Sequence, residues 1–329
     1  NASYVPNGAF ARAYCYVYTY DDRGRMSEKQ FPGREPEFMV YDRGDRLAMQ
    51  QDGNLRTSKK WIINKYDAHG RIVEQRLAQD DTADPSTRDT LQAQFDDGRL
   101  PLLYTLAAKS TLLYEHCYDE YPTSLSSELA FAAVPALAAA KDNRTKGLPT
   151  YEKLALLGDG GVLDYYERAF YYDYKGRVIQ TVQTWIGVHR TTNKYDFVGN
   201  LIAQQESYAK DGVTDMLDRT FTYDSRNRLL RETAQVNEGE QAVVNYAYDE
   251  LGRLSEKTYG TGEHSIREKM NYNIQGWLTD KSNNLFTMKL RYYDPLVDTQ
   301  AASYTGNISE WTFGPHTYRF TYDDYSRMT

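Results

Sequence analysis

The sequence predicts an all-β chain whose successive β-hairpins form one long, curled antiparallel sheet with a short helical insertion. Two observations support this prediction: a turn motif recurs along the chain, and tyrosine is over-represented, with 30 copies among 329 residues. Tyrosine favours pleated, half-buried surfaces and keeps a polar tip that can reach water. A hydrophilic chain with this many aromatic residues is therefore typical of strands that have one wet face.

The turn motif is Tyr-Asp-x-x-Gly-Arg followed by an apolar residue. Full copies begin at Tyr20, Tyr66, Tyr172 and Tyr248, and looser copies begin at Tyr41, Tyr195, Tyr223, Tyr272 and Tyr322. From Tyr172 the steps between copies are 23, 28, 25 and 24 residues, followed by 50, which equals two steps. A period near 25 residues accommodates two strands of about eight residues and two turns, so each repeat is expected to be one hairpin.

The motif has a mechanical explanation. Asp-x-x-Gly is typical of a type I turn followed by a left-handed residue, which is the common three-residue hairpin loop with a bulge. The aspartate can accept hydrogen bonds from the turn amides, and glycine takes the positive φ at little cost. Strand alternation then places Asp and Arg on one face and Tyr with the apolar residue on the other. Pairing with Arg should lower the pKa of each turn aspartate.

The exceptions to the motif are informative. Where the glycine is missing, its place is taken by Asp45, Asn227 or Ser326, and Asn and Asp tolerate the left-handed region best after Gly. Ser326 fits least well. Three further substitutions, which should weaken their turns, are Asn200, Asn273 and Trp277. The structural turn residues predicted from the copies are Tyr20, Asp21, Gly24, Arg25, Tyr66, Asp67, Gly70, Arg71, Tyr172, Asp173, Gly176, Arg177, Tyr195, Asp196, Gly199, Tyr223, Asp224, Asn227, Arg228, Tyr248, Asp249, Gly252 and Arg253.

The repeats divide the chain into N-terminal hairpins over residues 1–80, an irregular insertion over 81–165, and C-terminal hairpins over 166–329. Within the insertion, Ser86 is expected to cap a short helix, with Leu91 and Phe95 on one face and Gly98 at its end. A rival interpretation makes residues 95–100 a degenerate hairpin.

The rest of the insertion combines strand and helix patterns. Residues 111–118 have a strand pattern, and the alanine-rich residues 126–141 predict a helix that is broken near Pro135. Two apolar runs, 154–157 and 162–166, flank a glycine-rich turn and predict another hairpin.

The Tyr-Asp pairs resemble the RHS/YD repeats, which are named for them, and the match covers most of the chain. Stretches that resemble the RHS proteins of Bacteroidetes lie at residues 38–42, 51–54, 146–148, 276–279 and 306–309. The resemblance implies a β-sheet that spirals into a hollow shell, which often encloses a C-terminal polymorphic toxin or binds partners and sugars at the cell surface. The family's Asp-Pro-x-Gly-Leu closing hallmark has no match, because Asp84-Pro85 precedes Ser86 and Asp294-Pro295 precedes Leu296.

We therefore expect a structural shell or scaffold segment of a larger secreted or cell-surface RHS-repeat protein, without the toxin or the closing segment. The expected partner is the remainder of its own full-length chain. The alternative is a carbohydrate- or receptor-binding surface module, for which exposed aromatic residues at Trp185, Trp277 and Trp311 would be the sign. The resemblance implies a Gram-negative bacterium, with any signal peptide outside this sequence.

No catalytic site, cofactor or metal is predicted. The five histidines lie in separate segments, and no Cys or His spacing suggests zinc. No nucleophile elbow, phosphate loop or dinucleotide fingerprint is present. Cys15 and Cys117 are expected to be reduced thiols packed among aromatics. A net charge of −7 argues against nucleic-acid binding, and no apolar run is long enough to span a bilayer.

Overall fold

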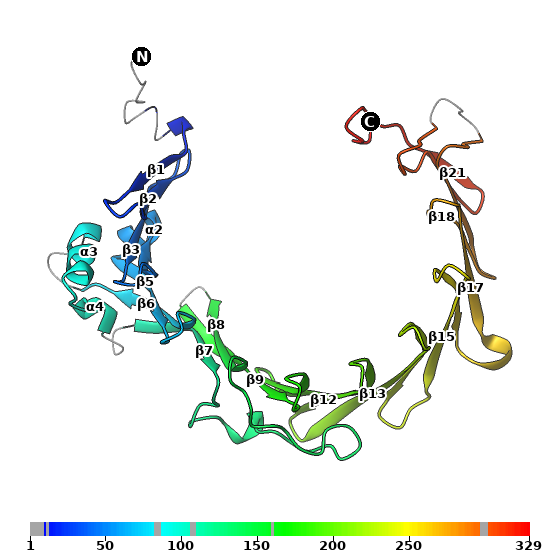
Figure 1. Cartoon of the computed structure of the whole chain (residues 1–329), viewed down its shortest axis with the longest axis horizontal. Helices are drawn as coiled ribbons and strands as arrows, with labels where there is room; N and C mark the ends of the chain where they lie inside the picture. Colours follow the sequence, from blue (N-terminus) through cyan, green and yellow to red (C-terminus); the bar gives the residue numbers. More distant parts are fainter. Residues whose placement is uncertain (1–9, 11–12, 82–86, 106–109, 159–160, 297–301) are drawn as a thin grey trace. The chain divides into compact units, whose positions relative to one another are not determined.

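The computed structural model describes residue 10 and residues 13–81, 87–105, 110–158, 161–296 and 302–329. Contacts divide the chain into two compact units. Unit 1 comprises residues 1–133 and 140–189, and unit 2 comprises residues 134–139 and 190–329. Figure 1 shows that strands dominate both units, and the predicted all-β class with a short helical insertion is confirmed.

Consecutive strands of unit 1 pair antiparallel from β1 to β10. These strands are β1 (Val17–Tyr20), β2 (Met26–Gln30), β3 (Glu37–Tyr41), β4 (Leu47–Gln51), β5 (Lys60–Tyr66), β6 (Ile72–Gln79), β7 (Ser110–Tyr118), β8 (Pro149–Gly158), β9 (Gly161–Tyr172) and β10 (Val178–Thr184). The helical segments of this unit are α2 (Gly53–Thr57), α3 (Arg88–Asp96), α4 (Leu102–Thr105) and the 3-10 turn η2 (Ser127–Leu129). The strand predicted over 111–118 and the hairpin predicted over 154–166 are confirmed as β7 and as β8 with β9.

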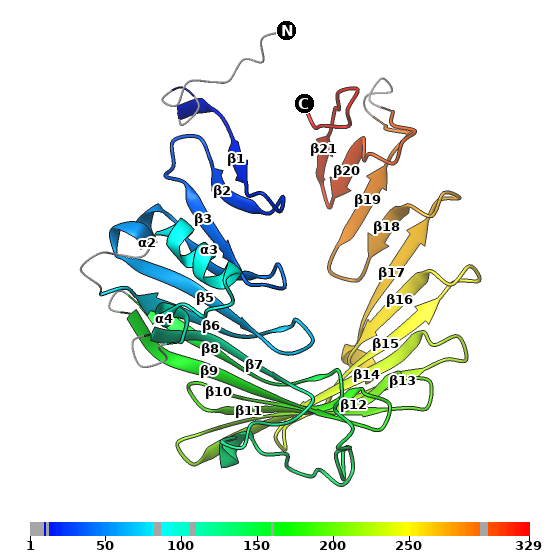
Figure 2. The same ribbon diagram turned by 60° about the vertical axis from the view of Figure 1, so that its left-hand side comes forward.

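Consecutive strands of unit 2 pair in the same way from β12 to β21. They follow β11 (Val188–Tyr195) and are β12 (Leu201–Lys210), β13 (Val213–Tyr223), β14 (Leu229–Val236), β15 (Ala242–Tyr248), β16 (Leu254–Tyr259), β17 (Ile266–Tyr272), β18 (Leu278–Ser282), β19 (Thr287–Arg291), β20 (Glu310–Phe313) and β21 (His316–Arg319). A 3-10 turn, η3 (Gly262–His264), lies between β16 and β17. Figure 2 shows the hairpins following one another in chain order within each unit.

One register recurs inside the hairpins. The repeat tyrosine lies opposite the apolar residue of its motif, as Tyr41 lies opposite Leu47, and the next pair is Val40 with Met49. Ala48 is therefore an extra, bulged residue, and such a bulge bends a strand and increases its twist. The same shift follows the pairs Tyr20–Met26, Tyr66–Ile72, Tyr172–Val178, Tyr223–Leu229, Tyr248–Leu254 and Tyr272–Leu278. The sequence predicted a bulge in the loop but gave no sign of this second one.

A second register recurs between neighbouring hairpins. Phe38, three residues before the repeat tyrosine Tyr41, lies opposite Glu28. Glu28 in turn lies two residues after Met26, the apolar residue of the preceding motif. The same rule gives the pairs Ile63–Met49, Thr220–Ala203, Asn245–Arg231 and Lys269–Glu256. In β2–β3 and in β4–β5 the pairing covers only two residue pairs. Near their turns, these neighbouring hairpins are therefore held together by side chains.

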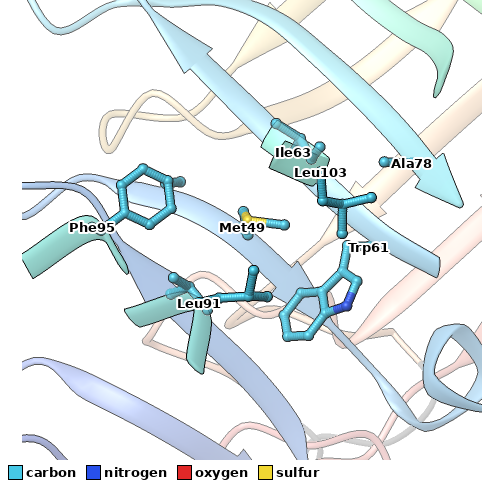
Figure 3. Packing of buried hydrophobic residues seen from close by; sticks show 9 residues of the cluster. Met49, Trp61, Ile63, Ala78, Leu91, Phe95 and Leu103 are labelled. Carbon is cyan, nitrogen blue, oxygen red and sulfur yellow. The ribbon is translucent and has the colours of Figure 1, made fainter. Parts of the chain in front are cut away.

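A hydrophobic core in unit 1 is built by residues of α3, α4 and β3 to β6, and Figure 3 shows its buried side chains. Trp61 and Met49 of the sheet pack with Leu91 and Phe95 of α3, and each is almost fully buried. Burying side chains of this size stabilises a fold by about 1.5–3 kcal/mol each. The core consists of Val40, Ala48, Met49, Trp61, Ile63, Ala78, Leu91, Phe95 and Leu103.

Helix α3 confirms the predicted helix and excludes the rival hairpin over residues 95–100. Its cap differs from the prediction: the Thr87 side chain accepts from the Thr90 amide in a capping box, while Ser86 lies outside the described residues. Gly98 follows the helix with a φ of 80°. The amide of Gln92, on the buried side of α3, bonds to the backbone N and O of Tyr41, at 2.9 and 3.0 Å.

The helix predicted over residues 126–141 is wrong. Only η2 is helical there, and the rest is in bends, turns and an isolated bridge. A tertiary contact overrides the helix propensity of alanine. The backbone of Ala132 donates to the buried side chain of Gln180 at 2.9 Å and accepts from it at 2.7 Å. This stretch therefore forms hydrogen bonds to β10 in place of those within a helix.

Unit 2 buries few side chains in the middle of its sheet. Of the described residues of β12 to β16, only Thr233 and Val243 are buried, so both faces of this part of the sheet carry partly exposed side chains. Ladders of polar side chains link the strands instead, as the Thr233 and Thr220 hydroxyls do at 2.7 Å. Gln205 likewise donates to Asp218 at 2.9 Å. Such cross-strand pairs contribute about 0.2–1 kcal/mol each.

Candidate functional site

The turns of the hairpins are built as one pattern, and the turn of β9–β10 is representative. Asp173 Oδ1 accepts from the backbone amides of Lys175 and Arg177 at 2.8 and 3.0 Å, and Oδ2 accepts from Arg177 Nε at 2.7 Å. The amide of Gly176 donates to the Asp173 carbonyl at 3.0 Å, and Gly176 has a φ of 75°. The aspartate therefore satisfies the turn amides and fixes the arginine side chain.

The other turns keep this arrangement with few changes. The fourth loop residue has positive φ at Gly24, Asp45, Gly70, Gly199, Asn227, Gly252, Gly276 and Ser326. In one altered turn, the Asn200 amide replaces the arginine and donates to Asp196 at 2.9 Å. In the other, Asn273 accepts from the Trp277 amide at 2.8 Å.

Seven of the turn aspartates have lowered pKa values: Asp21, Asp67, Asp173, Asp196, Asp224, Asp249 and Asp323. For Asp224 the largest influence is the hydrogen bond from the backbone amide of Arg228, and the Arg228 side chain adds to it. For Asp21 burial is the largest influence and raises the pKa, but hydrogen bonds from Arg25 and Arg23 outweigh it. The direction agrees with the prediction that pairing with arginine lowers these pKa values.

Neighbouring hairpins are connected through the repeat tyrosines. The hydroxyl of Tyr248 donates to the carbonyl of Leu229, the apolar residue of the preceding motif, at 2.9 Å. Corresponding bonds join Tyr41 to Met26, Tyr66 to Leu47, Tyr172 to Pro149, Tyr223 to Leu201, Tyr272 to Leu254, Tyr292 to Leu278 and Tyr322 to Ile308. The tyrosine thus bridges strands at the end where backbone pairing stops.

The arginine of one motif also contacts the tyrosine of the next. The guanidinium carbon of Arg228 lies 4.6 Å from the centroid of the Tyr248 ring. The same stacking joins Arg25 to Tyr41, Arg46 to Tyr66, Arg71 to Tyr118 and Arg253 to Tyr272. A cation over an aromatic face contributes about 0.5–1 kcal/mol at exposed sites. We use the word joint for this pair of contacts, the tyrosine hydroxyl to the carbonyl and the arginine over the ring.

The two registers reveal a repeat that the sequence motif does not show. Tyr118 lies opposite Pro149, and the next pair is Cys117 with Tyr151, as in the other hairpins. The Asp119 amide donates to the carbonyl of residue 148 at 3.0 Å, where a regular turn uses the arginine carbonyl. The segment 119–148 is therefore the turn of a repeat hairpin, expanded by insertion.

A second expanded turn lies in unit 2. Tyr292 donates to Leu278 at 2.8 Å, and Arg291 lies opposite Glu310, two residues past Ile308. The hydroxyl of Tyr322 donates to the Ile308 carbonyl at 2.9 Å, as the repeat tyrosines of other hairpins do to the preceding apolar residue. The segment 293–307 therefore replaces a short turn, and its residues 297–301 lie outside the described residues. This hidden hairpin explains the 50-residue step in the sequence.

A surface depression of about 560 Å³ lies between β6 and the first expanded turn. Glu74 and Glu115, which face each other across β6 and β7, both line it. Burial is the largest influence on Glu74, but hydrogen bonds from Lys65 and Arg76 outweigh it and lower its pKa. Burial, followed by the charge of Glu74, raises the pKa of Glu115. Two facing carboxylates with opposite pKa shifts are an arrangement that acid–base catalysis can use.

The histidine and cysteine that line the same depression have structural surroundings. His116 Nε2 lies 3.3 Å from a carboxylate oxygen of Glu152, and Nδ1 lies 2.9 Å from the Tyr114 hydroxyl. Burial lowers the pKa of His116. Burial, followed by the Glu115 charge, raises the pKa of Cys117 to about 11, which keeps the thiol protonated and unreactive at neutral pH.

The remaining expectations concern metals, membranes and tryptophans. Among the described residues, no cluster of three His, Cys, Asp or Glu side chains could hold a metal ion, and no helix is long and apolar enough to cross a membrane. Trp277 packs against Tyr292, and Trp311 stacks on Tyr318. Trp185 is 56% exposed beside the equally exposed Ile186. Trp277 and Trp311 are half-buried, so Trp185 is the exposed one of the three tryptophans.

Comparison with solved structures finds similar chains. The fold is similar to the crystal structures of TcdB2-TccC3-TEV and of TcdB2-TccC3 without its hypervariable C-terminal region. Both alignments cover 95% of this chain at 12% identity, with TM-scores of 0.45 and 0.40. This chain spans 16% and 17% of the length of those chains. Comparison with protein-family models and with curated proteins gives no match. The repeat geometry alone thus defines the class: a tandem array of tyrosine-jointed β-hairpins.

Proposed function

We propose that this chain is a wall segment of an RHS-type shell or scaffold, in a larger secreted or cell-surface protein of a Gram-negative bacterium. The joints carry this proposal. The Tyr248 hairpin, for example, uses its tyrosine hydroxyl to bind Leu229 of the hairpin before it, and its Leu254 carbonyl accepts from the tyrosine of the hairpin after it. A unit that repeats such contacts extends by addition and gives a wall whose length follows the number of repeats.

The polar side chains on both faces of the unit 2 sheet also support a role as a wall. A sheet that carries partly exposed polar side chains on both faces can separate two aqueous spaces, such as the inside and outside of a shell. From the resemblance to RHS repeats, including those of Bacteroidetes, we further propose that the wall of the full-length protein encloses a C-terminal toxin.

Protease protection tests the enclosing role. In the complete gene product, the proposal predicts that the segment C-terminal to the hairpins resists protease at concentrations that digest it when expressed alone. Replacing Tyr248 and Tyr272 by Phe removes two joint hydrogen bonds, of about 0.5–1.5 kcal/mol each, and should increase cleavage. Tyr174→Phe, at an exposed turn position, is the control. Equal cleavage of the enclosed and isolated segments would contradict the proposal.

We propose that the wall segment is not an enzyme. The facing carboxylates Glu74 and Glu115 are the strongest catalytic candidate, but Glu74 is already bonded to Lys65 at 2.9 Å and to Arg76. A structural charge pair is the simpler role for such a carboxylate. Chromogenic glycosides should give no turnover with the purified chain. Turnover that disappears in Glu115→Gln would overturn this proposal.

A carbohydrate- or receptor-binding module is the second candidate, and exposed Trp185 is the observation that favours it. An indole at a hairpin tip offers a flat apolar surface on which a sugar ring can stack. A glycan array separates the two candidates: the wall proposal predicts no specific signal. Specific binding by the wild-type chain that is lost in Trp185→Ala, but kept in Tyr174→Ala, would establish the binding module instead.

A further inference from the structure

The first repeat tyrosine has an unmade joint. Tyr20 occupies the repeat position in β1, opposite Met26, yet its side chain is 56% exposed. The other repeat tyrosines, at 41, 66, 118, 172, 195, 223, 248, 272, 292 and 322, are buried or half-buried. Among the described residues, no arginine lies over the Tyr20 ring and no carbonyl accepts from its hydroxyl. Tyr20 therefore presents one half of a contact that recurs through the molecule.

The strand that carries Tyr20 has an open edge. Strand β1 pairs with β2 on one side, and it is the outermost strand of unit 1 in Figure 2. No described strand pairs with its other edge. Tyrosine occupies every second position of this segment, at Tyr14, Tyr16, Tyr18 and Tyr20, and all four side chains are exposed. Unpaired backbone groups beside exposed aromatic side chains are suited to receive an added strand.

We propose that this edge is an interaction surface for a β-hairpin of the repeat's own type, presented by another polypeptide segment and docked antiparallel to β1. The arginine of the docked hairpin lies over the Tyr20 ring. The carbonyl of its next, apolar residue accepts from the Tyr20 hydroxyl. The inter-hairpin register places the residue two past that apolar residue opposite Val17. A sugar ring stacked on Tyr20 would leave the unpaired backbone groups of the strand edge unused.

This proposal rests on the wall function and extends it, because it identifies a β-hairpin as the element that binds the wall at the β1 edge. It also makes a chemical distinction. The docked strand must supply a cation and, on the next residue, a backbone acceptor, so a strand lacking arginine at that position should bind poorly. Non-specific hydrophobic binding to the exposed tyrosines would not depend on an arginine in the docked strand.

A peptide from the chain's own repeat provides the probe. The peptide spans residues 242–260, which include β15, its turn and β16, with added terminal cysteines that close it by a disulfide, because isolated hairpins are marginally stable. It carries Arg253 and Leu254, which make the joint to Tyr272 in the intact chain. Fluorescence anisotropy of the labelled peptide, titrated with the whole chain, should show saturable binding.

Variants test the assigned contacts. Tyr20→Ala should weaken peptide binding by about tenfold, the combined effect of losing the stacked cation and the hydrogen bond. Tyr20→Phe keeps the ring and should weaken it less. An Arg253→Ala peptide should lose affinity for the wild-type chain but lose little more against Tyr20→Ala, since contacting residues couple in such a cycle. Tyr325→Ala, at an exposed tyrosine outside the repeat positions, should bind as wild type does.

Three outcomes would overturn the proposal: no saturable binding, equal binding by Tyr20→Ala and wild type, or equal binding by the Arg253→Ala peptide. Native-state hydrogen exchange of β3 to β6 in each variant verifies that the rest of unit 1 stays folded. Failure here together with retained protease protection of the enclosed segment would remove this docking site and leave the wall function standing. Failure of both would remove the wall function as well.

Discussion

Replacing Gly176 by valine should destabilise the β9–β10 hairpin by about 1–3 kcal/mol. The residue has a φ of 75°, and the left-handed region costs an L-residue about 1–2 kcal/mol, with β-branched side chains least tolerant. The added Cβ meets no obstacle, because its nearest neighbour would be Leu148 Cδ1 at 3.7 Å, an ordinary contact. The predicted cost is therefore a backbone cost, and it should be smaller for Gly176→Asn than for Gly176→Val.

Because repeat arrays can unfold in parts, the measurement is native-state hydrogen exchange of amides in β9 and β10, supported by urea denaturation. The matched control is Asn227→Gly, which makes the opposite change at the same turn position and should be neutral or mildly stabilising. If Gly176→Val leaves the protection of β9 and β10 unchanged, the reasoning from turn geometry to stability is refuted.

Three further predictions concern the stability of the protein. Tyr248→Phe removes the 2.9 Å bond to Leu229 and should cost about 0.5–1.5 kcal/mol in urea denaturation, whereas Tyr174→Phe should cost nothing measurable. Asp173 has a lowered pKa, so its stabilisation is fully present above the unfolded value near 3.9 and is lost as pH falls through the folded value. The stability difference between wild type and Asp173→Asn should therefore shrink below about pH 4, and a constant difference would refute the linkage. Chelation with EDTA should leave the melting temperature unmoved, and a fall reversed by zinc or calcium would reveal a metal site.

The short turns could be predicted because their chemistry is local. An aspartate that binds its own turn amides and a residue that tolerates positive φ lie within five positions of each other, so the motif is visible in the sequence. The helix around Leu91 and Phe95 was predictable for the same reason, since its apolar spacing and cap lie within one segment. Even the less suitable Ser326 adopts the left-handed conformation, with a φ of 61°, because the rest of its turn is retained.

The joints and hidden repeats were not predictable because they depend on partners far apart in the chain. Tyr118 and Tyr292 lack the Gly-Arg turn, and only the strand register identifies them as repeat tyrosines. The second bulge is occupied by residues as different as Ser27 and Ile179, so composition does not mark it. The helix expected over 126–141 failed because Gln180, about fifty residues away, binds the backbone there.

Our central inference is that the hairpins with expanded turns keep the same register with their neighbours as the short-turn hairpins do. It is tested most directly by cross-linking Glu74→Cys with Glu115→Cys, in a chain whose Cys15 and Cys117 are replaced by serine. Directly opposed residues in an antiparallel pair have Cα atoms about 4.5–5.5 Å apart, within the range of a disulfide, whereas diagonal neighbours displaced by two residues are about 7–8 Å apart, beyond that range. We expect rapid oxidation of the 74–115 pair and little oxidation of a 74–113 pair. Preferential cross-linking of 74 with 113, or none at either pair, would contradict it.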